Sequence, residues 1–465
     1  MFYDEFLKAF SFEPTSCQDR LFRKASDFLS SDEGDILVVN GYAGTGKTSA
    51  VSAIINALIK LRFGCTLLAP TGRAAKVLSQ ISGRKASTIH KGIYRQKGVG
   101  DNGWGQFSLA PNKCKHTLFV VDEASLIGID SSSQANFGSG DLLSDLIRFV
   151  RGGDDCRLLL IGDSAQLPPV GMDESPALSP DYMDGFGGVS YITLTTVVRQ
   201  AESSGILWNA TALRKDLDAG RLALRTEGFP DVNRVSGEEL VDRLTEAYDR
   251  YGEDETIVIC RSNRKAIRYN LGIRSMVQFK EERLLRDDKL MIVKNCYQFV
   301  DENSPMGYIA NGDVARLERI GSFEDRYGLH FATAVLTFPD YDDERITAKV
   351  LLDTLESESA SLSSAQQEAL YEGVSADYGH IASKKKRYEQ VREDPFYNAL
   401  QLKYAQAVTC HKAQGGQWEC VFIDCPFWED EFCRDDLKWM YTALTRASKA
   451  VYLVNFKDSY FDEKI

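Results

Sequence analysis

Short apolar runs, each followed by polar residues, recur in the first part of this 465-residue chain. Stretches with apolar residues at helical spacing separate these runs, and the alternation predicts parallel strands joined by crossover helices. Four runs follow the pattern, at residues 36–39, 65–69, 118–121 and 157–161. We therefore expect an α/β fold with a doubly wound parallel sheet, in which ligands bind beyond the carboxyl ends of the strands.

A second α/β pattern begins near residue 191, with apolar runs at 193–198, 256–260, 420–423 and 451–454. An intervening stretch alternates instead with a period of two over 314–320, 329–338 and 345–352, which predicts a small β-barrel. Polar residues 356–391 follow, and their basic run at 384–387 is either a solvated face or a nucleic-acid contact.

These patterns predict four regions. They are a first domain at residues 1–87 and 117–190, an insert at 88–116, a second domain at 191–294 and 398–465, and a barrel insert at 295–397.

Composition excludes several classes of protein. With 43% hydrophobic and 26% charged residues, the chain is typical of a globular protein and not of a disordered one. No apolar run approaches the roughly 20 residues of a membrane span, and no secretory signal is recognisable. Ten cysteines without a C-x-x-C pair indicate reduced thiols and a cytoplasmic location. The net charge of −12 decides little, because nucleic-acid binding depends on the charge of one face.

A glycine-rich loop follows the first apolar run and leads into a helical pattern. Its sequence, G-x-x-x-x-G-K-[ST], is that of a phosphate loop in the required strand-to-helix context. Glycines let backbone N–H groups close around phosphate oxygens, and the helix N-terminus adds its positive dipole end. Lys47 is placed to reach the β- and γ-phosphates of ATP, and the Thr48 hydroxyl to bind Mg²⁺. The predicted nucleotide-binding residues are Gly41, Tyr42, Ala43, Gly44, Thr45, Gly46, Lys47 and Thr48.

Polar residues after the later strands suggest the rest of a hydrolytic site. Asp122 and Glu123 follow the third run, where a carboxylate is placed to bind Mg²⁺. Asp122 is therefore a predicted metal ligand and Glu123 a predicted general base. Gln166, after the fourth run, either senses the γ-phosphate and orients water or is a loop glutamine bonded to nearby backbone.

Two further features have alternative interpretations. Gln18 is either a surface glutamine of the helix before the phosphate loop or a residue whose carboxamide pairs with adenine. The insert at 88–116 contains Trp104 and Phe107 among glycines and basic residues, and is either a β-hairpin or an ordinary surface loop.

A series of motifs resembles superfamily 1 helicases, specifically the 5′-to-3′ branch typified by RecD and Dda. In chain order the motifs lie at 15–18, 41–48, 69–76, 121–125, 162–169, 198–200, 409–415 and 441–446. They include Gly-Asp-Ser-Ala-Gln-Leu-Pro-Pro at 162–169 and Tyr-Thr-Ala-Leu-Thr-Arg at 441–446. The resemblance implies two RecA-like parallel-sheet domains in tandem, with a pin hairpin in the first and an SH3-like β-barrel in the second.

The resemblance also implies roles for individual residues. Gln18 would read adenine, Gln166 would couple the γ-phosphate to the strand-binding surface, and Arg199 and Arg446 would be arginine fingers. Gly415 would belong to the nucleotide site. Trp104 and Phe107 would form the strand-separating pin. The positions that would hold single-stranded DNA are Pro70, Thr71, Gly72, Arg73, His90, Thr409, His411 and Lys412. The family usually has serine where this chain has Ala413, so a hydroxyl contact is absent there.

Together these features predict an ATP- and Mg²⁺-dependent DNA helicase of replication, recombination or repair. We expect a monomer that acts on single-stranded and forked duplex DNA, with replication or recombination proteins as candidate partners and no membrane. One alternative is the motor subunit of an exodeoxyribonuclease complex, and another is an ATP-switched strand-binding translocase that does not separate strands. A small-molecule kinase would leave the second α/β pattern and Arg446 unexplained.

Overall fold

The computed structural model describes residues 2–31, 33–99, 105–129, 138–198, 203–215, 217, 220–296, 298–300, 304, 306 and 308–462. The chain forms two compact units. The first comprises Met1–Arg95, Phe107–Gly237 and Ala413–Ile465, and the second comprises Gln96–Gln106 and Glu238–Lys412.

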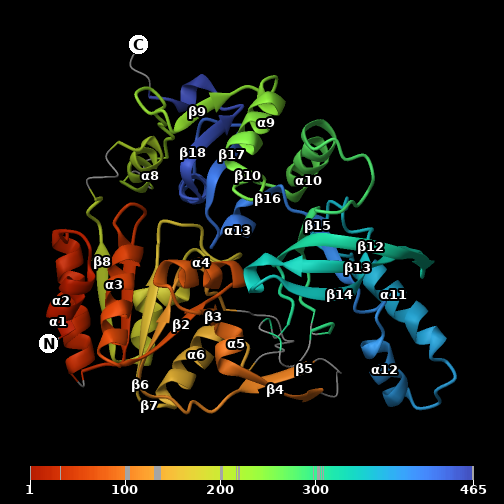
Figure 1. Cartoon of the computed structure of the whole chain (residues 1–465), viewed down its shortest axis with the longest axis horizontal. Helices are drawn as coiled ribbons and strands as arrows, with labels where there is room; N and C mark the ends of the chain where they lie inside the picture. Colours follow the sequence, from red (N-terminus) through yellow and green to blue (C-terminus); the bar gives the residue numbers. More distant parts are fainter. Residues whose placement is uncertain are drawn as a thin grey trace. The chain divides into compact units, whose positions relative to one another are not determined.

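A six-stranded parallel sheet forms the centre of the first unit (Figure 1). Its strand order is β3-β2-β6-β7-β1-β8, and the central strands contain continuous buried apolar runs because helices cover both faces. The strands are β1 (Ile36–Gly41), β2 (Gly64–Ala69), β3 (Ser87–Thr88), β6 (Lys115–Val121), β7 (Asp154–Gly162) and β8 (Val189–Leu194). The predicted doubly wound sheet is confirmed.

The chain leaves this sheet later than the predicted domain boundary at residue 190. Strand β8 pairs with β1 along its whole length, so that Leu194 lies opposite Gly41. The apolar residues after 190 therefore complete the first sheet and do not begin the second α/β pattern, because local periodicity does not identify the sheet to which a strand belongs.

Two separate cores on the two faces of the sheet follow from the period of a strand. Leu37 and Val39 of β1 pack with helices α1 (Phe2–Ala9), α2 (Ser16–Ser30) and α3 (Lys47–Lys60). Ile36 and Val38 point to the other face and pack with α5 (Ile89–Ile93) and α6 (Leu142–Arg151). Helix α4 (Gly72–Ser82) follows β2, and short helices α7 (Pro180–Met183), η1 (Ala124–Leu126), η2 (Pro176–Leu178) and η3 (Asp184–Phe186) complete this region.

The C-terminal part of the first unit contributes three parallel strands in the order β17-β18-β9. They are β17 (Trp418–Asp424), β18 (Ala447–Val454) and β9 (Val232–Val235), accompanied by helices α8 (Gly205–Lys215), α14 (Arg434–Leu444) and η7 (Asp458–Tyr460). Helix α14 packs against α8 and both central strands. Strand β9 was not predicted, because its short sequence Val-Asn-Arg-Val is too brief to stand out by periodicity.

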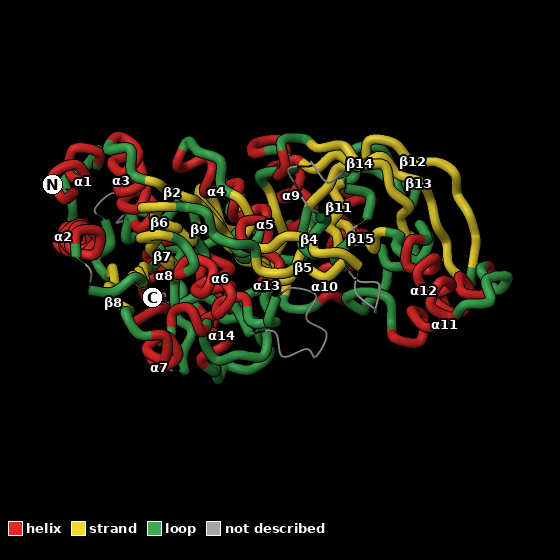
Figure 2. The backbone as a smooth tube through the Cα atoms, turned by 90° about the horizontal axis from the view of Figure 1, so that it is seen from below, coloured by secondary structure: helices red, strands yellow, loops and turns green. Residues whose placement is uncertain are grey.

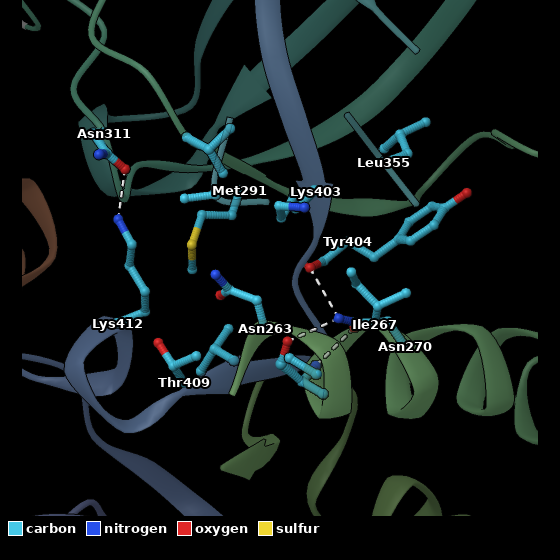
Figure 3. Close-up of a pocket in the computed structure, with 15 residues that line it drawn as sticks. Asn263, Ile267, Asn270, Met291, Asn311, Leu355, Lys403, Tyr404, Thr409 and Lys412 are labelled. Atoms are coloured by element: carbon cyan, nitrogen blue, oxygen red, sulfur yellow. Dashed lines mark hydrogen bonds between the residues drawn. The ribbon is translucent and has the colours of Figure 1, made fainter. Parts of the chain in front are cut away.

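The second unit combines a parallel strand pair with a closed barrel. The pair is β10 (Thr256–Cys260) and β16 (Ala407–Thr409), with helices α9 (Leu240–Tyr251), α10 (Asn263–Gly272), η5 (Ile273–Val277) and, after β16, α13 (Cys410–Ala413). The barrel strands are β11 (Lys289–Ile292), β12 (Val314–Arg326), β13 (Leu329–Phe338), β14 (Glu344–Leu351) and β15 (Leu400–Tyr404), with η6 (Pro339–Tyr341) between β13 and β14. Helix α10 and strands β11, β15 and β16 border a small cavity (Figure 3).

The barrel confirms the predicted insert and extends beyond its expected limits. Strands β11 and β15, which close the barrel, lie just outside residues 295–397 because their apolar runs resemble those of the α/β pattern. The polar stretch after β14 forms helices α11 (Ser364–Asp377) and α12 (Lys384–Glu393), which lie side by side (Figure 2). Leu370 and Val391 from these helices share a small core with Phe331 of β13.

The insert at 88–116 contains the predicted hairpin as the two-stranded sheet β4 (Tyr94–Val99) and β5 (Gly105–Leu109). The parallel sheets, the hairpin and the barrel together confirm the predicted fold class of two RecA-like regions with β inserts. None of the helices among the described residues is long and apolar enough to cross a membrane.

Candidate functional site

The phosphate loop connects β1 to α3 at the carboxyl edge of the first sheet. Gly44 and Gly46 have φ angles of +74° and +66°, in the left-handed region that residues with a Cβ adopt only with strain. A Cβ at Gly46 would also lie 2.5 Å from Nε2 of Gln18. These glycines let successive N–H groups turn toward one centre, which is the geometry that binds an anion.

Gln18 forms a hydrogen bond with the backbone of the phosphate loop. Its side chain is 1% exposed, its Nε2 donates to the carbonyl of Thr45 at 3.0 Å, and its Oε1 accepts from the N–H of Thr15 at 2.9 Å. The interpretation of Gln18 as a surface glutamine is therefore wrong. Its contact with adenine stays a prediction.

Two acidic residues follow β6 beside the loop. Glu123 has a φ of +54°, a strained conformation for a residue with a long side chain, and its N–H donates to Oδ1 of Asp122 at 2.9 Å. Burial and then the charge of Glu123 raise the pKa of Asp122 to about 6, although Lys47 opposes the shift. The neighbouring strand β7 ends at Asp163, whose pKa is also raised by burial. Strand order thus places three carboxyl groups around Lys47.

Side-chain hydrogen bonds connect the loop after β7 to β1 and the phosphate loop. The side chain of Asn40 exchanges two hydrogen bonds with Ser164, at 2.8 and 3.0 Å, and Lys47 donates to the carbonyl of Gly162 at 3.3 Å. On this loop Gln166 is 6% exposed, and its Oε1 has no hydrogen-bond partner among the described residues. An unpaired buried acceptor is costly unless a further group completes it. This favours the interpretation of Gln166 as a sensor over that of a loop glutamine bonded to backbone.

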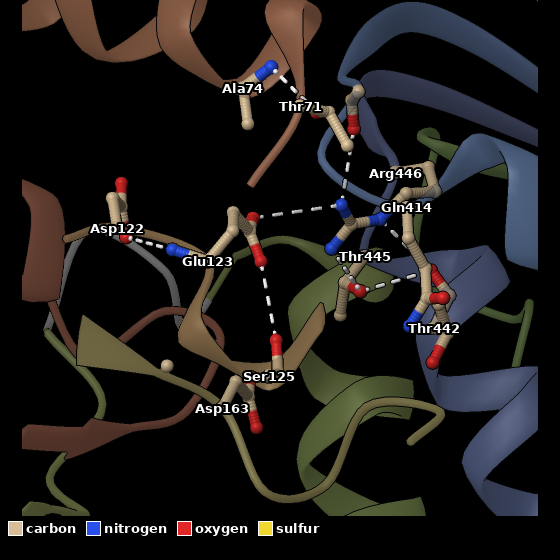
Figure 4. A network of polar contacts seen from close by, with 12 residues as sticks. Thr71, Ala74, Asp122, Glu123, Ser125, Asp163, Gln414, Thr442, Thr445 and Arg446 are labelled. Carbon is tan, nitrogen blue, oxygen red and sulfur yellow. Dashed lines mark hydrogen bonds and ion pairs between the residues drawn. The ribbon is translucent and has the colours of Figure 1, made fainter. Parts of the chain in front are cut away.

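Arg446 lies in the same polar network (Figure 4). It is 5% exposed, and its Nη1 lies 3.9 Å from Oε1 of Glu123. The guanidinium also donates to the carbonyls of Thr442 and Gly416 and to the hydroxyl of Thr445, at 3.1 to 3.2 Å. The structure therefore brings the predicted base and one predicted arginine finger together. The other finger, Arg199, lies outside the described residues.

Tyr441 is a residue of this site to which sequence reasoning assigned no role. Its hydroxyl accepts from the N–H of Ala43 in the phosphate loop at 2.8 Å and donates to Oδ2 of Asp163 at 2.6 Å. Burial and the charge of Asp163 raise the pKa of Tyr441, so the hydroxyl keeps its proton. Only its place in the motif at 441–446 could have drawn attention to it.

The loop that carries Gln166 is also held by the C-terminal segments. The N–H of Leu167 donates to the hydroxyl of Thr442 at 2.8 Å, and its carbonyl accepts from Nε2 of Gln414 at 2.6 Å. Gly415, with a φ of +72°, follows Gln414, and a Cβ there would lie 3.3 Å from the hydroxyl of Thr71. Thr442 and Gln414 thus hold the loop that carries Gln166.

The residues present fit a nucleoside triphosphate with Mg²⁺. The loop N–H groups and Lys47 supply donors for phosphate, and Gln166 retains an unpaired acceptor. Thr48 and Asp122 are the hydroxyl and carboxylate that would hold the metal, which suits Mg²⁺ because it needs few protein ligands beside phosphate and water.

The predicted strand-binding residues lie in both units. In the first unit Thr71 caps α4, Pro70 and Gly72 flank it, and the guanidinium of Arg73 lies 4.1 Å from the ring centre of Trp418. His90 lies on α5, where burial lowers its pKa to about 4, so the ring is neutral at pH 7.

In the second unit Thr409 ends β16, and His411 and Lys412 follow it with exposed side chains. Of the predicted pin residues, Trp104 lies outside the described residues, whereas Phe107 is half-buried and packs against the core under α6. The pin assignment of both stays a prediction.

Comparison with known proteins gives two family matches. An AAA domain matches residues 23–229, and a UvrD-like helicase C-terminal domain matches residues 404–454.

Individual relatives match parts of the chain. The ATP-dependent RecD2 DNA helicase of Deinococcus radiodurans is 32% identical over 41% of this chain and 24% of its own length. The ATP-dependent DNA helicase Dda of phage T4 is 34% identical over 31% of this chain and 30% of its own length. The chain thus spans less than a third of either relative. The match to a solved structure of Pif1 helicase from Bacteroides covers 98% of this chain and 95% of the Pif1 chain, at 15% identity and a TM-score of 0.46.

The fold and the site define a phosphate-loop ATPase-type protein with two RecA-like sheets. Two domain models and two relatives named as DNA helicases match parts of this chain, in agreement with the resemblance of its motifs to the RecD- and Dda-like branch of superfamily 1B.

Replacing Tyr441 by Phe removes the hydroxyl that joins Asp163 to the phosphate loop. We expect ATP turnover, measured as kcat/KM, to fall by about tenfold, because the buried carboxylate and N–H lose a partner worth about 1–3 kcal/mol. Tyr460→Phe is the matched control, since that buried hydroxyl donates to the carbonyl of Glu429 away from the loop. If both variants lose stability equally and retain equal turnover, Tyr441 has a structural role only.

Proposed function

We propose that this protein is an ATP-dependent DNA helicase that moves 5′ to 3′ along single-stranded DNA and separates duplex ahead of it. The observation that carries the proposal is the pairing of the half-buried Glu123 with the buried Arg446. A general base and a guanidinium from distant parts of the chain are the pair that phosphoryl transfer to water requires. Both RecD2 and Dda are named ATP-dependent DNA helicases, which supports the same activity here.

The site residues divide the work of hydrolysis among them. Lys47 and the N–H groups of the loop would hold the phosphates, and Thr48 and Asp122 would hold Mg²⁺, which would neutralise developing charge. Glu123 accepts a proton from the attacking water, while Gln166 orients that water with its free oxygen. Asp122 must be ionised for its part, and with a pKa of about 6 it is mostly so at pH 7.

Arg446 connects hydrolysis to movement. Its guanidinium lies beside Glu123 and donates to the carbonyl of Gly416. In the proposal it turns to the transferring phosphoryl group, which stabilises that charge and frees Glu123 to act as a base. Because Arg446 follows directly on α14, and Thr442 and Gln414 hold the Gln166 loop, the same change is passed to the C-terminal segments.

Translocation requires two groups of strand contacts whose grip alternates. We propose that Thr71 and its neighbours form one group and Thr409, His411 and Lys412 the other. Contacts with the phosphate backbone make the grip largely independent of sequence. The direction of movement, the monomeric state and the cytoplasmic location rest on the family resemblance.

Unwinding of tailed duplexes tests this function. With ATP and Mg²⁺ we expect strand separation from duplexes that carry a 5′ single-stranded tail and little from those with a 3′ tail. Lys47→Ala is the control, and it should abolish hydrolysis and unwinding while single-strand binding remains. Efficient separation from the 3′ tail would contradict the direction, and hydrolysis by Lys47→Ala would contradict the nucleotide site.

The pin can be tested by separate substitutions in the hairpin. Trp104→Ala should lower unwinding at least fivefold while strand-stimulated ATP hydrolysis stays within twofold, because a wedge acts on the duplex and not on the nucleotide. Phe107→Ala should in addition lower the melting temperature, because this ring packs against the core. Equal loss of unwinding and hydrolysis in Trp104→Ala would mean that the hairpin has a structural role.

A further inference from the structure

A cavity of about 130 Å³ lies in the second unit, apart from the nucleotide site residues. Helix α10 forms one wall, strands β11 and β15 another, and the segment from β16 to Lys412 a third (Figure 3). The cavity is partly open at one side. It therefore has the form of a pocket that a protruding group can enter.

The inner surface of the cavity is mainly apolar. Its apolar lining residues include Ile267, Met291 and Leu355, and Lys403 and Tyr404 also border it. An apolar cavity of about 150 Å³ in another protein holds one benzene molecule. The volume here is therefore suited to a single six-membered ring.

Two polar side chains that line the cavity have no hydrogen-bond partner among the described residues. Neither the carboxamide of Asn263 nor the hydroxyl of Thr409 makes a hydrogen bond with another described residue, and Figure 3 places Asn263 between Met291 and Thr409. The nearby Asn270 differs, because its carboxamide bonds to the carbonyls of Tyr404 and Ala407 and to the N–H of Ala407. Asn263 and Thr409 are thus the groups free to bond to a ligand.

The ammonium group of Lys412, at the edge of the cavity, can bind an anionic group of a ligand. Lys412 is exposed, and its Nζ donates to the neutral side-chain oxygen of Asn311 at 2.5 Å. Lys403 differs in its partners, since it donates to the carbonyls of Thr354 and Ser357. Burial lowers the pKa of both lysines, that of Lys403 to about 8. Lys412 can therefore bind a phosphate beside the cavity while a ring occupies its interior.

We propose that this cavity binds one pyrimidine base of the single-stranded DNA. The base enters between Ile267 and Met291, the carboxamide of Asn263 bonds to its polar edge, and Lys412 contacts an adjoining phosphate. Asparagine suits this role because its carboxamide offers a donor and an acceptor side by side, as base edges do. A purine is too large to enter fully. The inference rests on the proposed strand-binding function and adds a base preference to it.

Equilibrium binding of fluorescent oligonucleotides tests the site. Thymidine and cytidine oligomers should bind the full-length protein more tightly than adenosine oligomers. In a series of thymidine oligomers with one abasic site at successive positions, one position should weaken binding by about fivefold or more. A pyrimidine pocket at this place predicts that this one position matters and its neighbours do not.

Two variants change the cavity from different elements. Asn263→Ala removes the polar partner, and Ala360→Trp fills the mouth from an exposed position. Either should lower affinity for thymidine oligomers and abolish the effect of the abasic site. Ala376→Trp, at an exposed alanine of α11 outside the cavity, is the matched control and should change neither. Melting temperatures establish that each variant is folded.

The possible failures can be told apart. If the protein binds single strands but the abasic series is flat and both cavity variants bind as the wild type does, the cavity is not a base site and the helicase proposal stands. If the wild type binds no single-stranded DNA at all, the proposed function fails together with this inference.

Discussion

A phosphate loop needs backbone N–H groups that face its ligand, so the hydrogen bonds of the flanking strand and helix cannot alone fix its shape. The structure meets this constraint by holding the loop from outside. Gln18 binds a carbonyl on one side, and the hydroxyl of Tyr441 binds the N–H of Ala43 on the other. The left-handed glycines would otherwise make this segment the least restrained part of the sheet edge. Residues from both ends of the chain are therefore needed to shape a loop only eight residues long.

The nucleotide site also brings several carboxyl groups close together. Asp122, Glu123 and Asp163 surround Lys47, and burial raises the pKa of two of them. Such a cluster is tolerable because Lys47, Arg446 and the proton of Tyr441 offset the negative charge. In the proposed mechanism, phosphate would compete for Lys47 and Arg446 and the carboxylates would lose those partners. The electrostatic balance of the site would then depend on whether nucleotide is bound, which is a property that a two-state motor requires.

Much of this fold could be predicted because it depends on local patterns. The apolar runs of β1, β6 and β7 are continuous since these strands are buried on both faces, and the phosphate loop has a fixed spacing. Strand β9 is too short to be recognised, and β8, β11 and β15 were assigned to neighbouring regions because strand periodicity does not identify the pairing partner. In the site, Lys47, Asp122 and Glu123 follow from motif chemistry. The role of Tyr441 could not be foreseen, since it depends on a contact across nearly 400 residues of sequence. The same is true of the cavity beside Asn263, whose walls come from separate elements.

We propose that Arg446 completes the hydrolytic site of the phosphate loop, and single-turnover hydrolysis by an Arg446→Gln variant is the direct test. ATP affinity should stay within about fivefold of the wild type, whereas the rate of the chemical step should fall at least about a hundredfold, since arginine fingers contribute about 10³ to 10⁵ to such rates. Arg446→Lys should restore little of that rate, because an ammonium lacks the planar fork of donors. Hydrolysis within threefold of the wild-type rate, with ATP bound, would contradict the account.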